Sequence, residues 1–198
     1  MTDGESTDVI EFAQALGWRT AVALDEIENA HALVGGTERG RRYASQQINF
    51  AYAALLSSQF QGFCRDLHAE CVDSIVSAMP ARVQAFTRIE FFWARSLSKG
   101  NPHPGALGSD FNRLGIDFWD AVDALDSRNR RRRESLQELI DWRNAIAHQD
   151  FDRVASGGIP QLHLAKIRGW RSTVSVLSQH FDRAMYNYLR GLLDAEPW

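Results

Sequence analysis

Cysteine and proline are scarce in this sequence. The 198 residues include two cysteines and five prolines. Cys64 and Cys71 are separated by about 10 Å along one predicted helix, which is too far for a disulfide bond. Residues 1–5 show no secretory signal pattern, and a cysteine framework is lacking. We therefore expect two buried thiols and a protein of the reducing cytoplasm.

Neither sign of charge dominates, and no hydrophobic run is free of polar residues. The net charge of −3 means that any polyanion site must come from a local cluster. Residues 43–64 contain no charged side chain, which is long enough to suggest a membrane span. Seven polar residues within them argue against it: Gln46, Gln47, Asn49, Ser57, Ser58, Gln59 and Gln61. We predict a buried core helix and no membrane partner.

Motifs for several common chemistries are also lacking. The sequence has no glycine-rich phosphate loop and no nucleophile elbow. Glu28 and His31 have the spacing found in di-iron helical bundles, but no second such pair accompanies them. The remaining histidines show no ligand spacing. We therefore predict neither a metal site nor a cofactor.

Helical periodicity is the main pattern that is present. Apolar residues recur at steps of three and four, whereas no segment alternates with a period of two. The predicted helices cover residues 8–34 (with Asp8 and Glu11 as a capping pair), 45–79, about 83–97, 111–125, 130–148 and 160–188. Residues 1–6 are expected to be flexible, and residues 99–108, rich in glycine and proline, to form an exposed loop. The predicted fold is a single all-α domain over residues 1–198, an antiparallel helical bundle with one irregular insertion.

One segment of the predicted helix 130–148 has clear chemical potential. On a helical wheel, Arg143 falls within an apolar face made by Leu136, Leu139, Ile140, Ile146 and Ala147. A buried guanidinium is costly unless it is paired or opens onto a cleft. Asn144 and His148 are four residues apart and therefore neighbours on the helix surface. Imidazole transfers protons near neutral pH, and a guanidinium stabilises a phosphorane-like transition state, so the three residues suit phosphodiester transfer. The structural alternative is that Arg143 bridges helices through a carboxylate and that His148 stabilises the C-terminus of the helix.

A second cluster precedes this motif on the same helix. Five arginines occur within six residues: Arg128, Arg130, Arg131, Arg132 and Arg133. They repel one another near a helix N-terminus, whose dipole favours anions, so something must compensate them. RNA phosphate is the functional interpretation. The structural alternative is a solvated basic face paired with Glu134, Asp123 or Asp126.

The segment around Arg143, Asn144 and His148 resembles the HEPN superfamily (higher eukaryote and prokaryote nucleotide-binding domains). The hallmark of these small helical bundles is arginine, a polar residue that is often asparagine, three variable residues and histidine. Residues 60–67 are similar to an early-helix segment of bacterial HEPN families from toxin and defence loci. The closing helix is also similar, through Ile159, Pro160, Ile167, Trp170, Arg171, Val174, Leu177 and Asp182. The resemblance covers about residues 45–195, with Lys99 to Gly108 as an insertion.

The resemblance implies a metal-independent endoribonuclease, the toxin of a toxin–antitoxin or phage-defence system. It implies His148 as general acid/base, Arg143 as transition-state stabiliser and Asn144 as the residue that orients them. It also implies a homodimer whose motif helices face one another across a cleft, and a cognate antitoxin protein. Two alternatives stay open: a non-catalytic HEPN module that dimerises or binds nucleotides or a partner protein, and a DNA-binding regulator that uses the arginine tract. Trp142 and Trp170 are predicted core residues, with base stacking as the alternative.

Overall fold

Helices account for nearly all of the structure. The computed structural model describes residues 22–34, 41–152, 154 and 161–198, and within these ranges it contains helices and no strand. Residues 22–34 are helical, and the labelled helices are α2 (Arg41–Ser77), α3 (Ala81–Trp93), the 3-10 helix η1 (Ser96–Ser98), α4 (Pro104–Asn112), α5 (Phe118–Leu125), α6 (Asn129–His148) and α7 (Leu164–Leu193). The all-α prediction is confirmed. The predicted flexible start at 1–6, the Asp8 and Glu11 cap and Pro160 lie outside the described residues.

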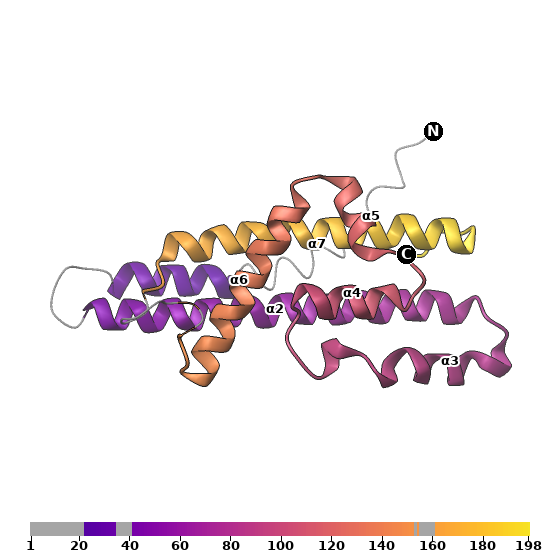
Figure 1. Ribbon diagram of the computed structural model, residues 1–198, viewed down its shortest axis with the longest axis horizontal. Coiled ribbons are helices and arrows are strands. Elements are labelled where there is room, and N and C mark those ends of the chain that lie inside the picture. The colour runs from indigo at the N-terminus through magenta and orange to yellow at the C-terminus, as the bar shows by residue number, and fades with distance from the viewer. Residues whose placement is uncertain (1–21, 35–40, 153, 155–160) are drawn as a thin grey trace.

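Two long helices, α2 and α7, form the frame of the molecule. They lie side by side and run in the same direction, whereas α3 folds back antiparallel to α2 (Figure 1). Bonds at both ends of α2 fix this pairing: Asn49 Nδ2 donates to Leu162 O over 2.7 Å, and Ser74 Oγ to Pro197 O over 3.3 Å. Helix α6 crosses both at a steep angle and packs on each of them (Figure 1). The antiparallel arrangement expected of the bundle thus describes α2 and α3 but not the two longest helices.

An aromatic cluster joins the short helices to this frame. Phe181 of α7 is fully buried, with its ring centroid 4.8 Å from that of Phe118, 5.5 Å from that of Trp119 and 5.9 Å from that of Phe60. Phe111 of α4 stacks on Phe118 at 4.4 Å. Because α5 leads directly into α6, this cluster fixes where the arginine tract begins.

The segment from 99 to 108 differs from the predicted exposed loop. Only residues 99–103 are loop; α4 begins at Pro104, and Ala106, Leu107 and Gly108 are buried. Proline suits the first turn of a helix, and the His103 side chain accepts the Ala106 N–H over 3.2 Å. Trp119 Nε1 also donates to Pro104 O over 2.9 Å. The glycine and proline content therefore marked a helix start and not a continuous loop.

The predicted helix over 111–125 is divided into two. Helix α4 ends at Asn112, and α5 begins at Phe118. Between them Gly115 has a φ of +95°, a conformation that glycine adopts without strain. Asn112 Oδ1 accepts the Phe118 N–H over 3.0 Å and so fixes the turn.

Two further predictions concern the long core helix. Cys64 and Cys71 are free and buried, as predicted, and burial raises the pKa of both thiols well above the usual value. None of the helices in the described part of the chain has an apolar stretch long enough to cross a membrane.

Two carboxyl groups on α2 and α7 are close enough for their charges to interact: Asp182 of α7 is buried, and Glu70 of α2 is half-buried. Burial raises the pKa of Asp182 to about 6. The pKa of Glu70 is raised to about 7 by burial and by the charges of Asp182 and Asp66. In both groups the folded pKa exceeds the unfolded one, so the folded state binds more protons between about pH 4 and pH 7. The ionised carboxylates therefore destabilise the fold above pH 7.

Replacing one of these carboxylates should remove part of that penalty. We expect Asp182→Asn to be more stable than the wild type at pH 8, with a smaller difference at pH 5, where Asp182 is mostly protonated. The difference between the two proteins is the useful quantity, because His68, whose pKa is lowered to about 4 by burial, affects both equally. Urea unfolding at the two pH values measures it. An equal difference at both pH values would contradict this assignment.

Candidate nucleic-acid interface

Helix α6 carries both sequence motifs, and its apolar residues fix its orientation. Leu136, Leu139 and Ile140 are buried, as the helical wheel predicts. The rest of the inner face is made by Trp142 and Ala145, whereas Ala147 is exposed. The predicted face was thus rotated at its C-terminal end. Arg143 consequently lies at the edge of the buried surface, half-buried, and not at its centre.

Arg143 and Asn144 are in contact, as predicted. Arg143 Nη1 donates to Asn144 Oδ1 over 3.4 Å, and Asn101 Nδ2 donates to the same oxygen over 2.5 Å. Within the described residues Arg143 makes no ion pair with a carboxylate. The guanidinium charge is therefore not neutralised by any described residue of the chain.

Asn101 is a member of this group that sequence reasoning missed. It lies in the short loop before α4, which Gln61 of α2 holds by donating to Leu97 O and Gly100 O. No spacing rule connects residue 101 to residue 144, because the contact depends on how α2 and α6 pack. Its only sequence signal is an amide within a short loop of the predicted insertion.

His148 is the last residue of α6 and is exposed. Gln149 follows with a φ of 55°, a left-handed conformation that ends the helix, and its N–H donates to Ala145 O. In the described part of the chain the imidazole has no hydrogen bond, and the hydrogen bond from Arg143 goes to Asn144. In a single chain, Arg143 is thus hydrogen-bonded to Asn144, and His148 is exposed to solvent about one helical turn further along α6.

The two tryptophans near the motif belong to the core, as predicted. Trp170 is 1% exposed and Trp142 is 8% exposed, with ring centroids 6.5 Å apart. Phe50 of α2 lies 6.4 Å from Trp142 and stacks on Phe151 at 5.4 Å. These contacts fix the C-terminal end of α6 and the chain just after His148. Base stacking by either indole is thereby excluded in this conformation.

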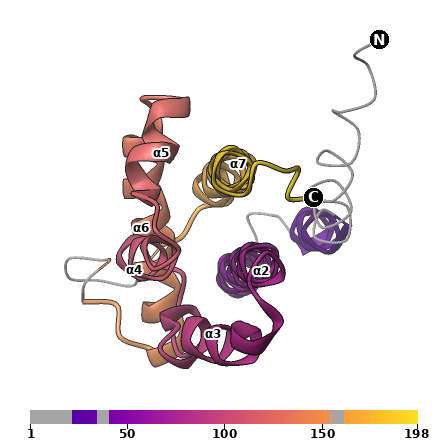
Figure 2. The ribbon, with the colours of Figure 1, turned by 90° about the vertical axis from the view of Figure 1, so that its right-hand side faces the viewer.

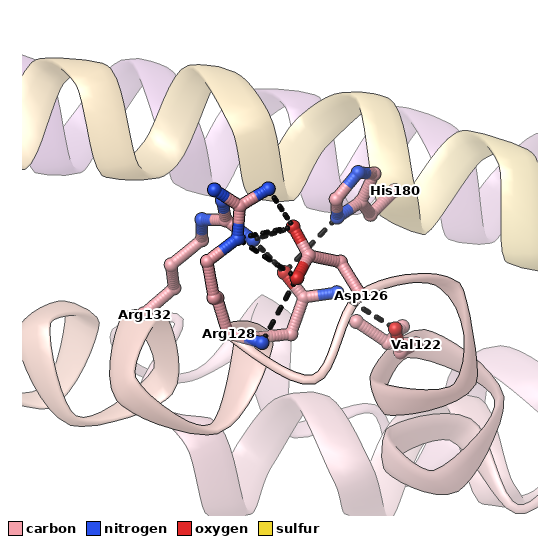
Figure 3. Close-up of polar contacts among 6 residues, drawn as sticks. Val122, Asp126, Arg128, Arg132 and His180 are labelled. Atoms are coloured by element: carbon pink, nitrogen blue, oxygen red, sulfur yellow. Dashed lines mark hydrogen bonds and ion pairs between the residues drawn. The ribbon is translucent and has the colours of Figure 1, made fainter.

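The arginine tract begins with a pair of arginines that share one carboxylate (Figure 3). The Asp126 carboxylate accepts three hydrogen bonds: from Arg128 Nε over 3.0 Å, from the backbone N–H of Arg128 over 3.0 Å and from Arg132 Nη1 over 2.9 Å. The hydrogen bonds from Arg128, followed by that from Arg132, hold the pKa of Asp126 well below its usual range. Asp126 therefore supplies the negative charge that the start of α6 favours.

A second carboxylate serves the next arginines. Asp123 Oδ2 lies 3.4 Å from Arg130 Nε and 3.5 Å from Arg133 Nη2. The guanidinium of Arg133 also lies 4.9 Å from the ring centroid of Trp119, which is a cation–π contact. Of the two interpretations, the pairing with Asp123 and Asp126 is what the single chain shows. Arg131 is exposed and has no partner in the described part of the chain.

Asn129, within the tract, is fully buried and links three elements. Its Nδ2 donates to Val122 O over 2.7 Å, while its Oδ1 accepts from Arg132 at 2.7 Å and lies 3.0 Å from Nδ1 of His180 (Figure 3). Burial and the charge of Arg132 lower the pKa of His180. Sequence reasoning missed this residue because arginines surround it. The bonds fix the start of α6 against α5 and α7.

Glu28, the residue with di-iron spacing, belongs to an ion-pair network. Its carboxylate accepts from Tyr52 Oη at 2.7 Å and from Arg168 Nε at 2.9 Å, and lies 3.4 Å from Arg171 Nη1. Burial by itself would raise the pKa of Glu28. The hydrogen bonds from Arg168 and Tyr52 have the larger combined effect, so the pKa of Glu28 is lowered. The described residues contain no group of metal-binding side chains.

Comparison of the chain with models of protein families, with curated proteins and with solved structures found no match.

Proposed function

We propose that this protein is a metal-independent endoribonuclease whose site lies at the C-terminal end of α6. The observation that supports it is the state of Arg143: a half-buried guanidinium, bonded to Asn144 and without a carboxylate among the described residues. Arginine cannot shed its charge at ordinary pH, so such a group favours an anion from outside the chain. His148 lies exposed one turn further along the same helix. Phosphate is the anion that these donors suit best.

The proposed chemistry uses the 2′-hydroxyl of RNA as the nucleophile. His148 accepts the 2′-hydroxyl proton, the 2′-oxygen attacks phosphorus, and Arg143 stabilises the added negative charge. The bond to the 5′-oxygen breaks, and an imidazolium returns a proton to that oxygen. The products are a 2′,3′-cyclic phosphate and a 5′-hydroxyl. In the proposed homodimer two copies of His148 border the cleft, so one can accept while the other donates.

The family resemblance also provides a biological setting for this activity. The protein acts in the cytoplasm as the toxin of a toxin–antitoxin or phage-defence system. A cognate antitoxin protein silences it. The resemblance to HEPN proteins through Arg143, Asn144 and His148 supports this setting.

The test is RNA cleavage in the presence of a chelator. We expect the wild type to cut RNA in EDTA, to leave DNA of the same sequence intact, and to lose cleavage in Arg143→Ala. Equal cleavage by the wild type and this variant, or no cleavage of any RNA by the wild type, would discard the proposal.

Arginines of the tract should differ in their contribution to RNA binding. Arg131→Ala should weaken binding and reduce the slope of log K against log salt by about one, because it removes one phosphate contact. Arg132→Ala should mainly lower the free energy of unfolding, because Arg132 bonds to Asp126 and Asn129. Salt titrations of RNA binding and urea unfolding of both variants measure this contrast. Identical effects of the two substitutions would contradict it.

One observation favours the non-catalytic HEPN module as the second candidate. Asn144 Oδ1 already accepts two donors, Asn101 and Arg143, without any ligand. If that group is only structural, Arg143→Ala should be less stable than the wild type in urea unfolding. Expression of the wild type should then have no effect on growth. Growth arrest by the wild type that Arg143→Ala abolishes, with stability retained, would exclude this candidate.

A further inference from the structure

The outer face of α3 carries large apolar side chains that the bundle leaves exposed. Val83 is 37% exposed, Phe86 67%, Ile89 60% and Trp93 78%, and no residue of α3 is buried. Their spacing of three, three and four residues places all four on one side of the helix. A contiguous exposed patch of this kind marks an interaction surface more often than a singly exposed residue does.

The way α3 is attached explains why this face points outward. Among the labelled helices of the described chain, α3 packs on α2 alone. Phe91 and Phe92 face the core, and Arg88 pairs with Asp73 of α2. Figure 2 shows α3 at the outer edge of the molecule, next to α2. The opposite side of the helix is therefore open to another molecule.

The residues on this face are arranged symmetrically about Phe86. Val83 and Ile89 lie three residues on either side of it, and Arg82 and Glu90 lie four residues on either side. If two copies of α3 pack antiparallel with a two-fold axis at Phe86, each residue of one copy comes level with its counterpart in the other. Val83 then comes level with Ile89, and Phe86 meets Phe86.

The charges fit the same arrangement. Arg82 is exposed and makes no ion pair in the described part of the chain, and Glu90 is exposed with an unpaired carboxylate there. The antiparallel pair brings Arg82 of each copy level with Glu90 of the other, twice by symmetry. We propose that the α3 face (Arg82, Val83, Phe86, Ile89 and Glu90) pairs with the α3 face of a second copy of this chain, with Trp93 at each end of the contact, level with residue 79 of the other copy.

The area available agrees with a modest interface. Fully buried aromatic side chains contribute about 150–250 Å² each, so the exposed parts of Phe86 and Trp93 offer roughly 600 Å² in a pair of copies. Val83 and Ile89 add to this area. The total does not exceed the lower limit for a specific protein interface, about 1,000 Å². The pairing is thus reversible and sensitive to single substitutions. It is a separate contact from the α6 cleft of the proposed nuclease homodimer, so substitutions on α3 test it without touching the nuclease motif.

Cysteine cross-linking tests the antiparallel geometry directly. With a short bismaleimide, Phe86→Cys should link two chains, because the two copies of residue 86 meet at the axis. Trp93→Cys is the matched control, since its two copies are about 21 Å apart along an antiparallel pair. The native Cys64 and Cys71 are buried and do not compete. Equal linking by the two variants, or linking by neither, would overturn the proposal.

Exchange of charged residues provides a second test, in which Phe86 is not substituted. Arg82→Glu places two like-charge pairs in the interface and should weaken association about tenfold or more in sedimentation equilibrium. Adding Glu90→Arg to the same chain restores opposite charges and should restore the affinity. An unchanged association constant in Arg82→Glu, or a double variant as weak as the single one, would also overturn the proposal.

Discussion

The His148→Ala variant is expected to cleave RNA about 10²–10⁴ times more slowly than the wild type, the usual contribution of a positioned acid or base. The imidazole is exposed at the end of α6, and no described residue bonds to it, so its removal should not affect folding. Single-turnover cleavage at saturating protein isolates the chemical step from binding. Affinity for RNA should stay nearly unchanged.

His163 provides a matched control for this prediction. It is also exposed, and it precedes α7 without a side-chain capping bond. His163→Ala should therefore keep wild-type cleavage. The assignment of His148 fails if both variants cleave at the same rate.

Phe181→Ala is expected to lower the free energy of unfolding by about 3–5 kcal/mol, the range for removing a fully buried aromatic side chain. Phe181 lies among Phe60, Phe118 and Trp119, which come from α2 and α5. These rings cannot all move into the space left by its removal, because they belong to separate helices. Urea unfolding followed by circular dichroism measures the loss.

The control for Phe181→Ala lies on the same helix. Leu192 is 52% exposed, so Leu192→Ala should change the free energy of unfolding by less than about 1 kcal/mol. Comparable losses in the two variants would contradict the assignment of Phe181 to the core that joins α5 to α7.

The helices could be predicted because a single physical signal determines them. Steps of three and four residues between apolar side chains are visible in the sequence and persist in the structure, as for Leu136, Leu139 and Ile140 of α6. The burial of Trp142 and Trp170 followed from the same reasoning. Helix ends were less certain at glycine and proline, which is why 104–108 was predicted as loop although Pro104 begins α4.

Contacts between distant residues could not be predicted in the same way. The bond between Asn101 and Asn144 depends on the packing of α2 and α6, which no local spacing encodes. Pairing of the arginine tract with Glu134, Asp123 or Asp126 was the alternative to RNA binding. Which arginine bonds to Asp123 and which to Asp126 could not be predicted. Periodicity predicts that α3 is a helix, yet it cannot tell whether the apolar stripe of Phe86 and Trp93 faces its own core or solvent.

The chemistry of the RNA ends is the most direct test of the nuclease proposal. Wild-type protein in EDTA should convert RNA to fragments that end in a 2′,3′-cyclic phosphate and begin with a 5′-hydroxyl, and a single 2′-deoxy substitution at the cleavage position should prevent the cut. Mass spectrometry of the fragments determines both termini. Fragments with a 5′-phosphate, or cleavage that persists next to the 2′-deoxy position, would contradict transfer to the 2′-oxygen by Arg143 and His148.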